Sequence, residues 1–148
     1  MAGMTAKSLS LFLCGVLLLS GCAKGTTKVP GMPPTVLPDG VTLIGARELF
    51  DAYTEDVEAA DRKYKGKVLE VVGKVKMNRS LFGSRYIVLG STGLMSTWAV
   101  DCLFTDTTNP RLDEVKKEDI ARIRGKCEGL ELDVILKECK LISFEQQE

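Results

Sequence analysis

A change in the spacing of apolar residues near Lys65 constrains the fold more than any other feature of the sequence. From Lys65 onward apolar side chains recur at every second position, as Leu69, Val71 and Val75 do, and this period is that of a β-strand. Gly73 stands in the middle of the run, where a missing side chain allows a strand to bulge or bend. A long strand that bends at its centre is what a small β-barrel needs in order to close.

The residues before that run have helical spacing. Apolar residues follow one another at intervals of three and four between Leu49 and Tyr64, and charged residues occupy most other positions. The pattern predicts one amphipathic helix of about five turns over residues 46–63.

Four more strands and a short helix are predicted after the glycine-bent strand, and a loop over Asn78–Ser84 is expected to turn the chain. The expected elements are strands over Tyr86–Leu89 and Thr97–Phe104 joined by a Gly90–Gly93 turn, a helix that Asn109 caps with Pro110 in its first turn, and strands over Ile120–Glu128 and Val134–Ile142. This is the order of elements in an OB-fold. We therefore predict a mainly β protein with some α-helix, a five-stranded OB-fold barrel preceded by an N-terminal amphipathic helix.

The first 22 residues have the pattern of a lipoprotein signal peptide. Lys7 precedes an apolar stretch of 11 residues, Leu9–Leu19, which is too short to cross a bilayer as a helix. Leu19-Ser20-Gly21-Cys22 resembles the bacterial lipobox, which implies cleavage before Cys22 and acylation of its sulfur and its new amino group. More than one acyl chain gives a stable membrane anchor. An ordinary signal peptide with a chance thiol at Cys22, or a short buried helix, is the alternative.

We expect three parts: a signal peptide over residues 1–21, a lipidated cysteine and Pro/Gly-rich tether over residues 22–41, and the OB-fold domain with its helix over residues 42–148. The tether holds four of the five prolines of the chain, and such composition is typical of a semi-extended linker. Ala23 follows the lipidated cysteine, which by resemblance to lipoprotein sorting in enteric bacteria implies an outer-membrane protein that faces the periplasm.

The composition argues against catalysis and against a strongly basic surface. Residues 22–148 carry 19 basic and 20 acidic side chains, whereas non-specific nucleic-acid binders usually show a basic excess. The chain has no histidine, which removes the commonest general base and zinc ligand. Asp101 and Cys102 are adjacent on an expected strand, so they point to opposite faces and form no dyad. We expect no enzyme, no cofactor and no metal site.

Three cysteines remain once Cys14 leaves with the signal peptide and Cys22 is lipidated. If the last turn centres near Asp133, Cys127 and Cys139 stand opposite each other on the last two strands, and we expect a disulfide between them. Cys102 with Cys139 is the rival pairing, because the third and fifth strands of an OB-fold are neighbours.

OB-fold barrels usually bind ligands on the face of their second and third strands, between two flanking loops. The candidate ligand-binding residues in these parts are Lys76, Arg79, Phe82, Arg85, Tyr86 and Trp98. This aromatic and basic mixture suits stacking against bases, sugars or peptide side chains; the alternative is that the aromatic residues close the barrel and the arginines are solvated. The acidic Glu131 and Asp133 on the far loop favour a cationic partner or a protein surface over a phosphate backbone.

Several motifs resemble a bacterial family of tRNA-anticodon-binding-like OB-fold proteins over residues 42–143. The motifs are Ala59-Ala60-Asp61, Lys63-Tyr64-Lys65-Gly66-Lys67, Val71, Gly73, Val100–Phe104, Arg124–Cys127 and Leu136–Cys139. Many members of that family resemble this chain in their lipoprotein signals, and the family name implies nucleic acid by analogy of fold. Where the family often has Tyr-x-x-Asn-Glu, this chain has Tyr53-Thr54-Glu55-Asp56-Val57. If that asparagine caps or braces something in relatives, Asp56 either does so differently or does not do so, and both alternatives stay open.

These observations favour a non-catalytic envelope lipoprotein whose OB-fold domain binds a protein, peptide or glycan partner. The alternative is a nucleic-acid-binding lipoprotein, and an unrecognised enzyme or a purely structural role also stays open. A continuous positive groove with exposed aromatics on the face of the second and third strands would favour nucleic acid. A mixed or acidic face would favour a protein or glycan.

Overall fold

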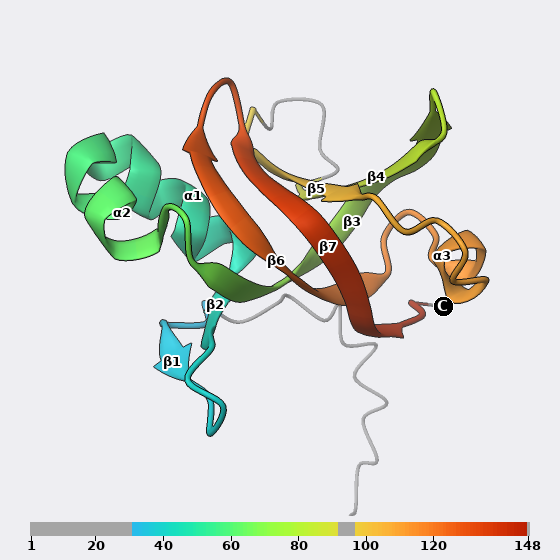
Figure 1. The fold of residues 1–148 in the computed structure, drawn as a ribbon, viewed down its shortest axis with the longest axis horizontal. Helices are drawn as coiled ribbons and strands as arrows, with labels where there is room; N and C mark the ends of the chain where they lie inside the picture. Colours follow the sequence, from blue (N-terminus) through green and yellow to red (C-terminus); the bar gives the residue numbers. More distant parts are fainter. Residues whose placement is uncertain (1–30, 92–96, 148) are drawn as a thin grey trace, which may run out of the picture.

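The computed structural model of the protein describes residues 31–91 and 97–147, and it contains a closed β-barrel (Figure 1). Its strands are β3 (Val68–Leu81), β4 (Ser84–Gly90), β5 (Ala99–Phe104), β6 (Ile120–Leu130) and β7 (Val134–Glu145). They lie in the order β3-β4-β5-β7-β6, and β6 pairs with β3 to close the barrel. This is the five-stranded OB-fold predicted from the sequence. Cys22, the signal peptide and the start of the tether lie outside the described residues.

Strand β3 belongs to both halves of the barrel because it changes partner midway. Residues 68–74 pair with β6, and residues 75–81 pair with β4. The expected bend has two parts: a register shift between Val75 and Met77, and Gly73, where an added Cβ would lie 2.7 Å from the Cβ of Ala46. The missing side chain at Gly73 therefore allows the first helix to approach the strand.

The single helix expected over residues 46–63 is wrong, because the structure has two helices there. Helix α1 (Ala46–Glu55) ends at Asp56, whose backbone is extended with φ −154° and ψ 99°, and helix α2 (Val57–Tyr64) begins after it. The Asp56 side chain accepts a hydrogen bond of 2.9 Å from the backbone N–H of Ala59. Asp56 thus caps α2, a role for which aspartate is favoured.

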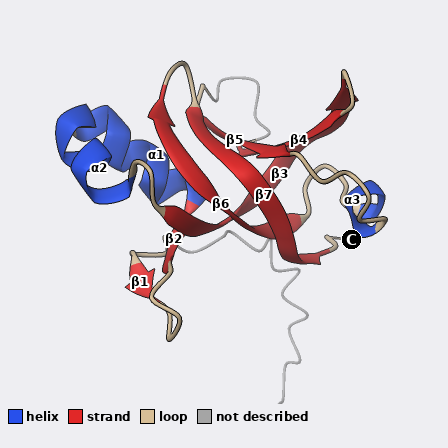
Figure 2. Ribbon diagram, in the orientation of Figure 1, coloured by secondary structure: helices blue, strands red, loops and turns tan. Residues whose placement is uncertain are grey.

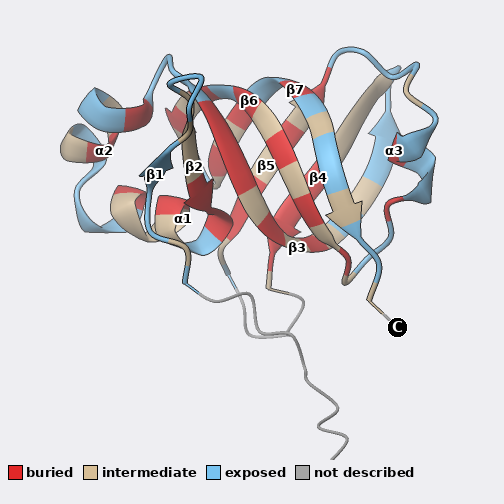
Figure 3. Ribbon diagram, turned by 90° about the horizontal axis from the view of Figure 1, so that it is seen from below, coloured by how far each residue is buried: buried red, intermediate tan, exposed pale blue. Residues whose placement is uncertain are grey.

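The two helices cover one opening of the barrel, whereas α3 (Arg111–Glu114) lies at the other end (Figure 2). Leu49 and Tyr53 of α1 are fully buried, and they join the core formed by the inward-facing residues of all five barrel strands. Along β6, buried residues alternate with less buried ones (Figure 3). Asn109 accepts a hydrogen bond of 3.0 Å from the backbone N–H of Arg111, as a helix cap does.

Part of the expected tether is folded against the barrel. Strand β1 (Thr35–Val36) pairs with β2 (Thr42–Gly45), and β2 runs parallel to β3. The backbone N–H of Gly45 donates to the carbonyl of Met32 at 3.2 Å. The chain is therefore ordered against β2, the strand that adjoins the barrel, from about residue 32, although proline-rich composition predicted a linker up to residue 41.

The loop expected over Asn78–Ser84 is also wrong. Strands β3 and β4 extend through these residues and pair up to Leu81 and Ser84, which leaves Phe82 and Gly83 as a two-residue turn.

Among the described residues, no helix combines the length and the apolarity needed to cross a bilayer.

Candidate ligand-binding face

The six residues predicted to bind a ligand lie in three separate places on the barrel. Arg79 and Tyr86 face each other across β3 and β4, with Lys76 beside them. Phe82 lies at the tip of the β3–β4 hairpin. The remaining two, Arg85 and Trp98, contact helices on other sides of the barrel.

Arg79 and Tyr86 form a stacked pair on the outer surface of the barrel. They are register partners, and the Cζ atom of Arg79 lies 6.0 Å from the centroid of the Tyr86 ring. At that distance a guanidinium is attracted by the face of an aromatic ring. Arg79 is exposed and Tyr86 is half-buried, so the pair offers both a cation and a ring to a ligand.

Asp101 of β5 lies on the same surface, and sequence reasoning did not include it. Its register partner on β4 is Val88, whose own partner on β3 is Met77. Burial raises the pKa of the Asp101 carboxyl, and the nearby Asp133 raises it further, whereas Arg79 and Lys76 act in the opposite direction. Strand alternation places Asp101 on the surface opposite to Cys102, so this signal was available in the sequence.

We call this surface the β3–β4–β5 face. It is made of Lys76, Met77, Arg79, Tyr86, Val88, Asp101 and Leu103. Two cations and one half-buried carboxylate surround an apolar centre, with Asp133 of the β6–β7 turn nearby. The charge on this face is mixed.

Arg85 lies on the opposite side of β4 and holds helix α3. Its Nη1 donates to Asn78 Oδ1 at 3.2 Å and to the Leu112 carbonyl at 3.5 Å, and its Nη2 forms an ion pair with Asp113. Asn78 also donates to the carbonyls of Leu112 and Val115, at 2.8 Å each. Because neighbouring residues of a strand point to opposite faces, Arg85 does not join Tyr86.

Trp98 packs against helix α1. Its ring centroid lies 6.2 Å from that of Phe50, and the Arg47 guanidinium lies 5.3 Å above the Trp98 ring. Both aromatic rings are half-buried against the core. This arrangement matches the alternative in which Trp98 helps to close the barrel.

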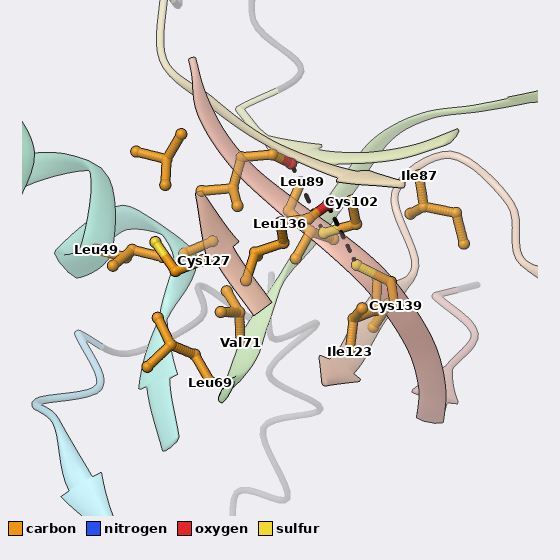
Figure 4. Packing of buried hydrophobic residues seen from close by; sticks show 14 of the residues in the cluster. Leu49, Leu69, Val71, Ile87, Leu89, Cys102, Ile123, Cys127, Leu136 and Cys139 are labelled. Carbon is orange, nitrogen blue, oxygen red and sulfur yellow. Dashed lines mark hydrogen bonds between the residues drawn. The ribbon is translucent and has the colours of Figure 1, made fainter. Parts of the chain in front are cut away.

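The expected opposition of Cys127 and Cys139 is wrong. Cys127 faces Leu136, because the β6–β7 pairing shifts register three times along its length. The Cys127 sulfur lies 3.5 Å from the hydroxyl oxygen of Tyr53. Cys139 donates to the Leu136 carbonyl at 3.4 Å (Figure 4). Cys102, Cys127 and Cys139 are all buried free thiols in the structure, and neither proposed disulfide is present among them.

Burial raises the pKa of the Cys102 thiol well above its ordinary value, and the neighbouring Cys139 thiol contributes. The Cys102 thiol is therefore protonated at neutral pH. Over residues 31–91 and 97–147, no group of three or more Cys, Asp and Glu side chains is arranged to hold a metal ion.

Comparison with known proteins agrees with this fold. The model of the tRNA_anti-like family matches residues 1–141. A solved structure from Klebsiella pneumoniae subsp. pneumoniae, described as a "putative nucleic acid-binding lipoprotein", is 13% identical and superposes with a TM-score of 0.57, covering 71% of this chain and 94% of its own. A "putative aspartyl-tRNA synthetase" from Leishmania major is 14% identical with a TM-score of 0.48, covering 77% of this chain and 23% of its own.

None of the curated proteins compared with the chain matches it significantly. The Klebsiella structure shares the fold, and the family model spans nearly the whole sequence. The chain belongs to the tRNA_anti-like family.

Proposed function

We propose that this protein is a non-catalytic, membrane-anchored lipoprotein of the bacterial envelope that binds a protein, peptide or glycan partner through the β3–β4–β5 face. The anchor is the acylated Cys22 at the end of the signal peptide over residues 1–21. The outer membrane, with the domain facing the periplasm, is the location that Ala23 favours.

The observation that carries the proposal is the mixed charge of an exposed face that also holds a stacked Arg79–Tyr86 pair. Asp101 is partly withdrawn from water on this face, and its raised pKa means that the folded protein disfavours the charged form. Perturbed carboxylates of this kind cluster at functional sites, because a binding surface keeps them despite their cost. Complementary charges on a partner would lower that cost.

Catalysis gains no support from this face. Its ionisable groups are two cations, a carboxylate and the Tyr86 phenol, which stacks with Arg79. No thiol or hydroxyl of β5 itself lies on the same side as Asp101, because Cys102 points into the core. A binding role therefore fits the side chains better.

Nucleic acid is the second candidate. It is favoured by the description of the Klebsiella structure, which shares the fold, and by the stacking pair, since aromatic rings and arginines stack on bases. The carboxylate of Asp101, with Asp133 nearby, argues against nucleic acid, because a phosphate backbone is bound by cations.

A photo-crosslinking residue, benzoylphenylalanine, placed at position 86 of the full-length protein in intact cells tests the proposal. We expect a crosslinked protein or glycan product from position 86, and none from position 143 on β7, where the exposed Ser143 serves as the matched control. Failure to obtain any product specific to position 86 would contradict the proposal.

Binding of a single-stranded oligonucleotide to the purified protein tests the second candidate. A nucleic-acid binder should lose affinity with a log–log salt slope of about −0.7 per phosphate neutralised. We expect no such binding at low salt, and a steep salt-dependent affinity that Arg79→Ala weakens would replace our proposal by the second candidate.

A further inference from the structure

The β3–β4 hairpin extends well beyond the body of the barrel (Figure 1). Its turn consists of two residues, Phe82 and Gly83, with φ angles of +50° and +78°. Positive φ at both central residues is the geometry of a type I′ turn, for which the sequence Asn-Gly is strongly preferred. A bulky side chain at the first position is unfavourable there.

Phe82 is 98% exposed, and its neighbour Leu81 is 44% exposed. The fold therefore gains almost no buried apolar surface from this ring, although the ring occupies a backbone conformation that suits asparagine or glycine. Two independent features, exposure and backbone geometry, both oppose phenylalanine at this position in the isolated protein. Such a combination is expected where a side chain has a role outside its own domain.

We propose that Phe82 is an anchor residue that inserts into an apolar pocket of a protein partner. The inference rests on the proposed function, because it concerns the partner bound at the β3–β4–β5 face, which continues along the hairpin through Arg79. A rigid aromatic ring has few rotatable bonds to immobilise on binding. Aromatic and arginine side chains are also the types that most often dominate the energy of protein interfaces.

The charge near the tip favours a protein over a lipid surface. Arg85 is already paired with Asp113, so Arg79 is the nearest exposed arginine to the tip that has no ion pair among the described residues. Anionic lipid surfaces are usually recognised by clusters of about four to eight basic residues. One arginine beside a phenyl ring instead suits an apolar pocket with an acidic rim.

The position of the tip in the molecule supports the same choice. The described chain begins beside the β1–β2 hairpin, and Figure 1 shows this hairpin and the β3–β4 tip at opposite sides of the barrel. The tip is therefore remote from residue 31, the first described residue, and a protein partner can reach it without approaching that end of the described chain.

The first test compares the stability of Phe82→Asn with that of the wild-type full-length protein. Because Asn-Gly suits this turn, we expect the melting temperature to rise by about 2–4 °C. Val36→Asn is the matched control, since Val36 is 71% exposed on β1 at the far side, and it should leave both melting and crosslinking unchanged. A lower melting temperature for Phe82→Asn would mean that the ring stabilises the fold, which overturns the proposal.

The second test uses the protein crosslink formed from position 86. At a low concentration of this protein, Phe82→Asn should reduce the yield of the crosslink from position 86 about 30-fold. Phe82→Trp should give the wild-type yield, because an aromatic anchor is kept. An unchanged yield in Phe82→Asn would overturn the anchor while leaving the proposed function intact. Absence of any wild-type crosslink from position 86 would instead contradict the proposed function.

The third test identifies the occupant by placing benzoylphenylalanine at position 82 itself in intact cells. We expect a product with the same protein that crosslinks from position 86. A product with phospholipid would show that the tip enters a membrane, and a product with nucleic acid would show that it stacks on bases. Either of these, or no product at all, overturns insertion into a protein pocket.

Discussion

Glu70 is fully buried on β3, and its Oε2 atom accepts two hydrogen bonds from Arg124 of β6, at 2.8 Å from Nε and 2.5 Å from Nη2. Its other carboxylate oxygen pairs with Arg122. Arg124 extends the network to Asp39 at 2.8 Å, in the loop between β1 and β2. Hydrogen bonding to Glu70 first, and to Asp39 second, raises the pKa of Arg124. One buried carboxylate thus joins two barrel strands to the segment that precedes the helices.

Replacing Glu70 with glutamine should destabilise the protein by about 1–3 kcal/mol, because two guanidinium groups lose the anion that they bind. Urea unfolding measures the change. Glu58→Gln is the control, since Glu58 is exposed and its ion pair with Arg62 spans 3.8 Å, and it should change the free energy of unfolding by less than about 0.5 kcal/mol. Equal effects of the two substitutions would refute a structural role for the network.

Arg79 and Arg85 lie on opposite sides of the same hairpin, and their alanine variants should have opposite effects. Arg85→Ala should destabilise the protein by about 1–3 kcal/mol, because Arg85 links Asn78 to helix α3. Arg79→Ala should leave stability nearly unchanged and lower the yield of the crosslink from position 86. Urea unfolding measures the stability of each variant, and the crosslink from position 86 measures partner binding. Loss of the crosslink in Arg85→Ala but not in Arg79→Ala would show that Arg85, and not Arg79, binds the partner.

The barrel strands were predictable because alternation of apolar residues depends on neighbours in sequence, and it persists along β6 and over residues 134–136 of β7. The break between α1 and α2 was missed, since apolar spacing continues across it and only the cap at Asp56 interrupts the helix. The hairpin tip was predicted as a loop because Asn78, Ser80 and Gly83 are turn-forming residues. Pairing with β4 determines their conformation instead.

The candidate site was predictable only in part. Arg79 and Tyr86 were included because both lie on the expected strands or their loop, and register brings them together. Including Arg85 with them was an avoidable error. Arg85 is adjacent to Tyr86 in sequence, and neighbouring residues of a strand point to opposite faces of the sheet. Trp98 precedes β5, so its contact with Phe50 depends on where α1 packs. Tertiary contacts of that kind leave no local signal.

Alkaline pH should destabilise the protein through the Cys102 and Cys127 thiols and the Tyr53 phenol. Burial is the main cause of the raised pKa values of Cys102, Cys127 and Tyr53. In the unfolded chain these groups ionise near pH 8.5 for cysteine and about 10 for tyrosine. A raised folded pKa gives stability that is complete below the unfolded pKa and is lost as the pH rises above it.

The melting temperature should therefore be constant to about pH 8 and fall steadily toward pH 10.5. Cys102→Ala should make the decline shallower, because one thiol no longer contributes to it, whatever its effect at pH 7. Differential scanning calorimetry at closely spaced pH values measures both curves. Parallel curves for the variant and the wild type would contradict the assignment to Cys102.

The proposed membrane anchor gives a direct prediction for Cys22. Cys22→Ser should abolish metabolic labelling with palmitate and leave an unprocessed precursor, because the acylated sulfur is removed. Sucrose-gradient fractionation of the wild type should place the protein in the outer membrane. Cys127→Ser is a suitable comparison for labelling, since Cys127 is buried in the barrel and no lipobox precedes it. Labelling that persists in Cys22→Ser would disprove acylation at that residue.

Asp101→Asn should stabilise the protein at neutral pH and weaken partner binding. Burial, then Asp133, raises the pKa of the Asp101 carboxyl, so ionised Asp101 opposes folding. This cost is absent at a pH below the unfolded pKa, about 3.9, where the carboxyl is protonated in both the folded and the unfolded protein. Stability is lost as the pH rises from that unfolded pKa through the folded pKa. We expect a melting temperature about 2 °C higher than wild type at pH 7 and no difference at pH 3.

Asp106→Asn provides the contrast for this experiment. Hydrogen bonds from the Thr108 side chain and backbone lower the pKa of Asp106, so its charged form favours folding above the unfolded pKa, and the asparagine variant should gain no stability at pH 7. Only Asp101→Asn should reduce the crosslink from position 86, since Asp106 lies beyond the end of β5. A gain for Asp101→Asn that persists at pH 3 would attribute the effect to side-chain packing and remove the electrostatic argument for this face as a binding surface.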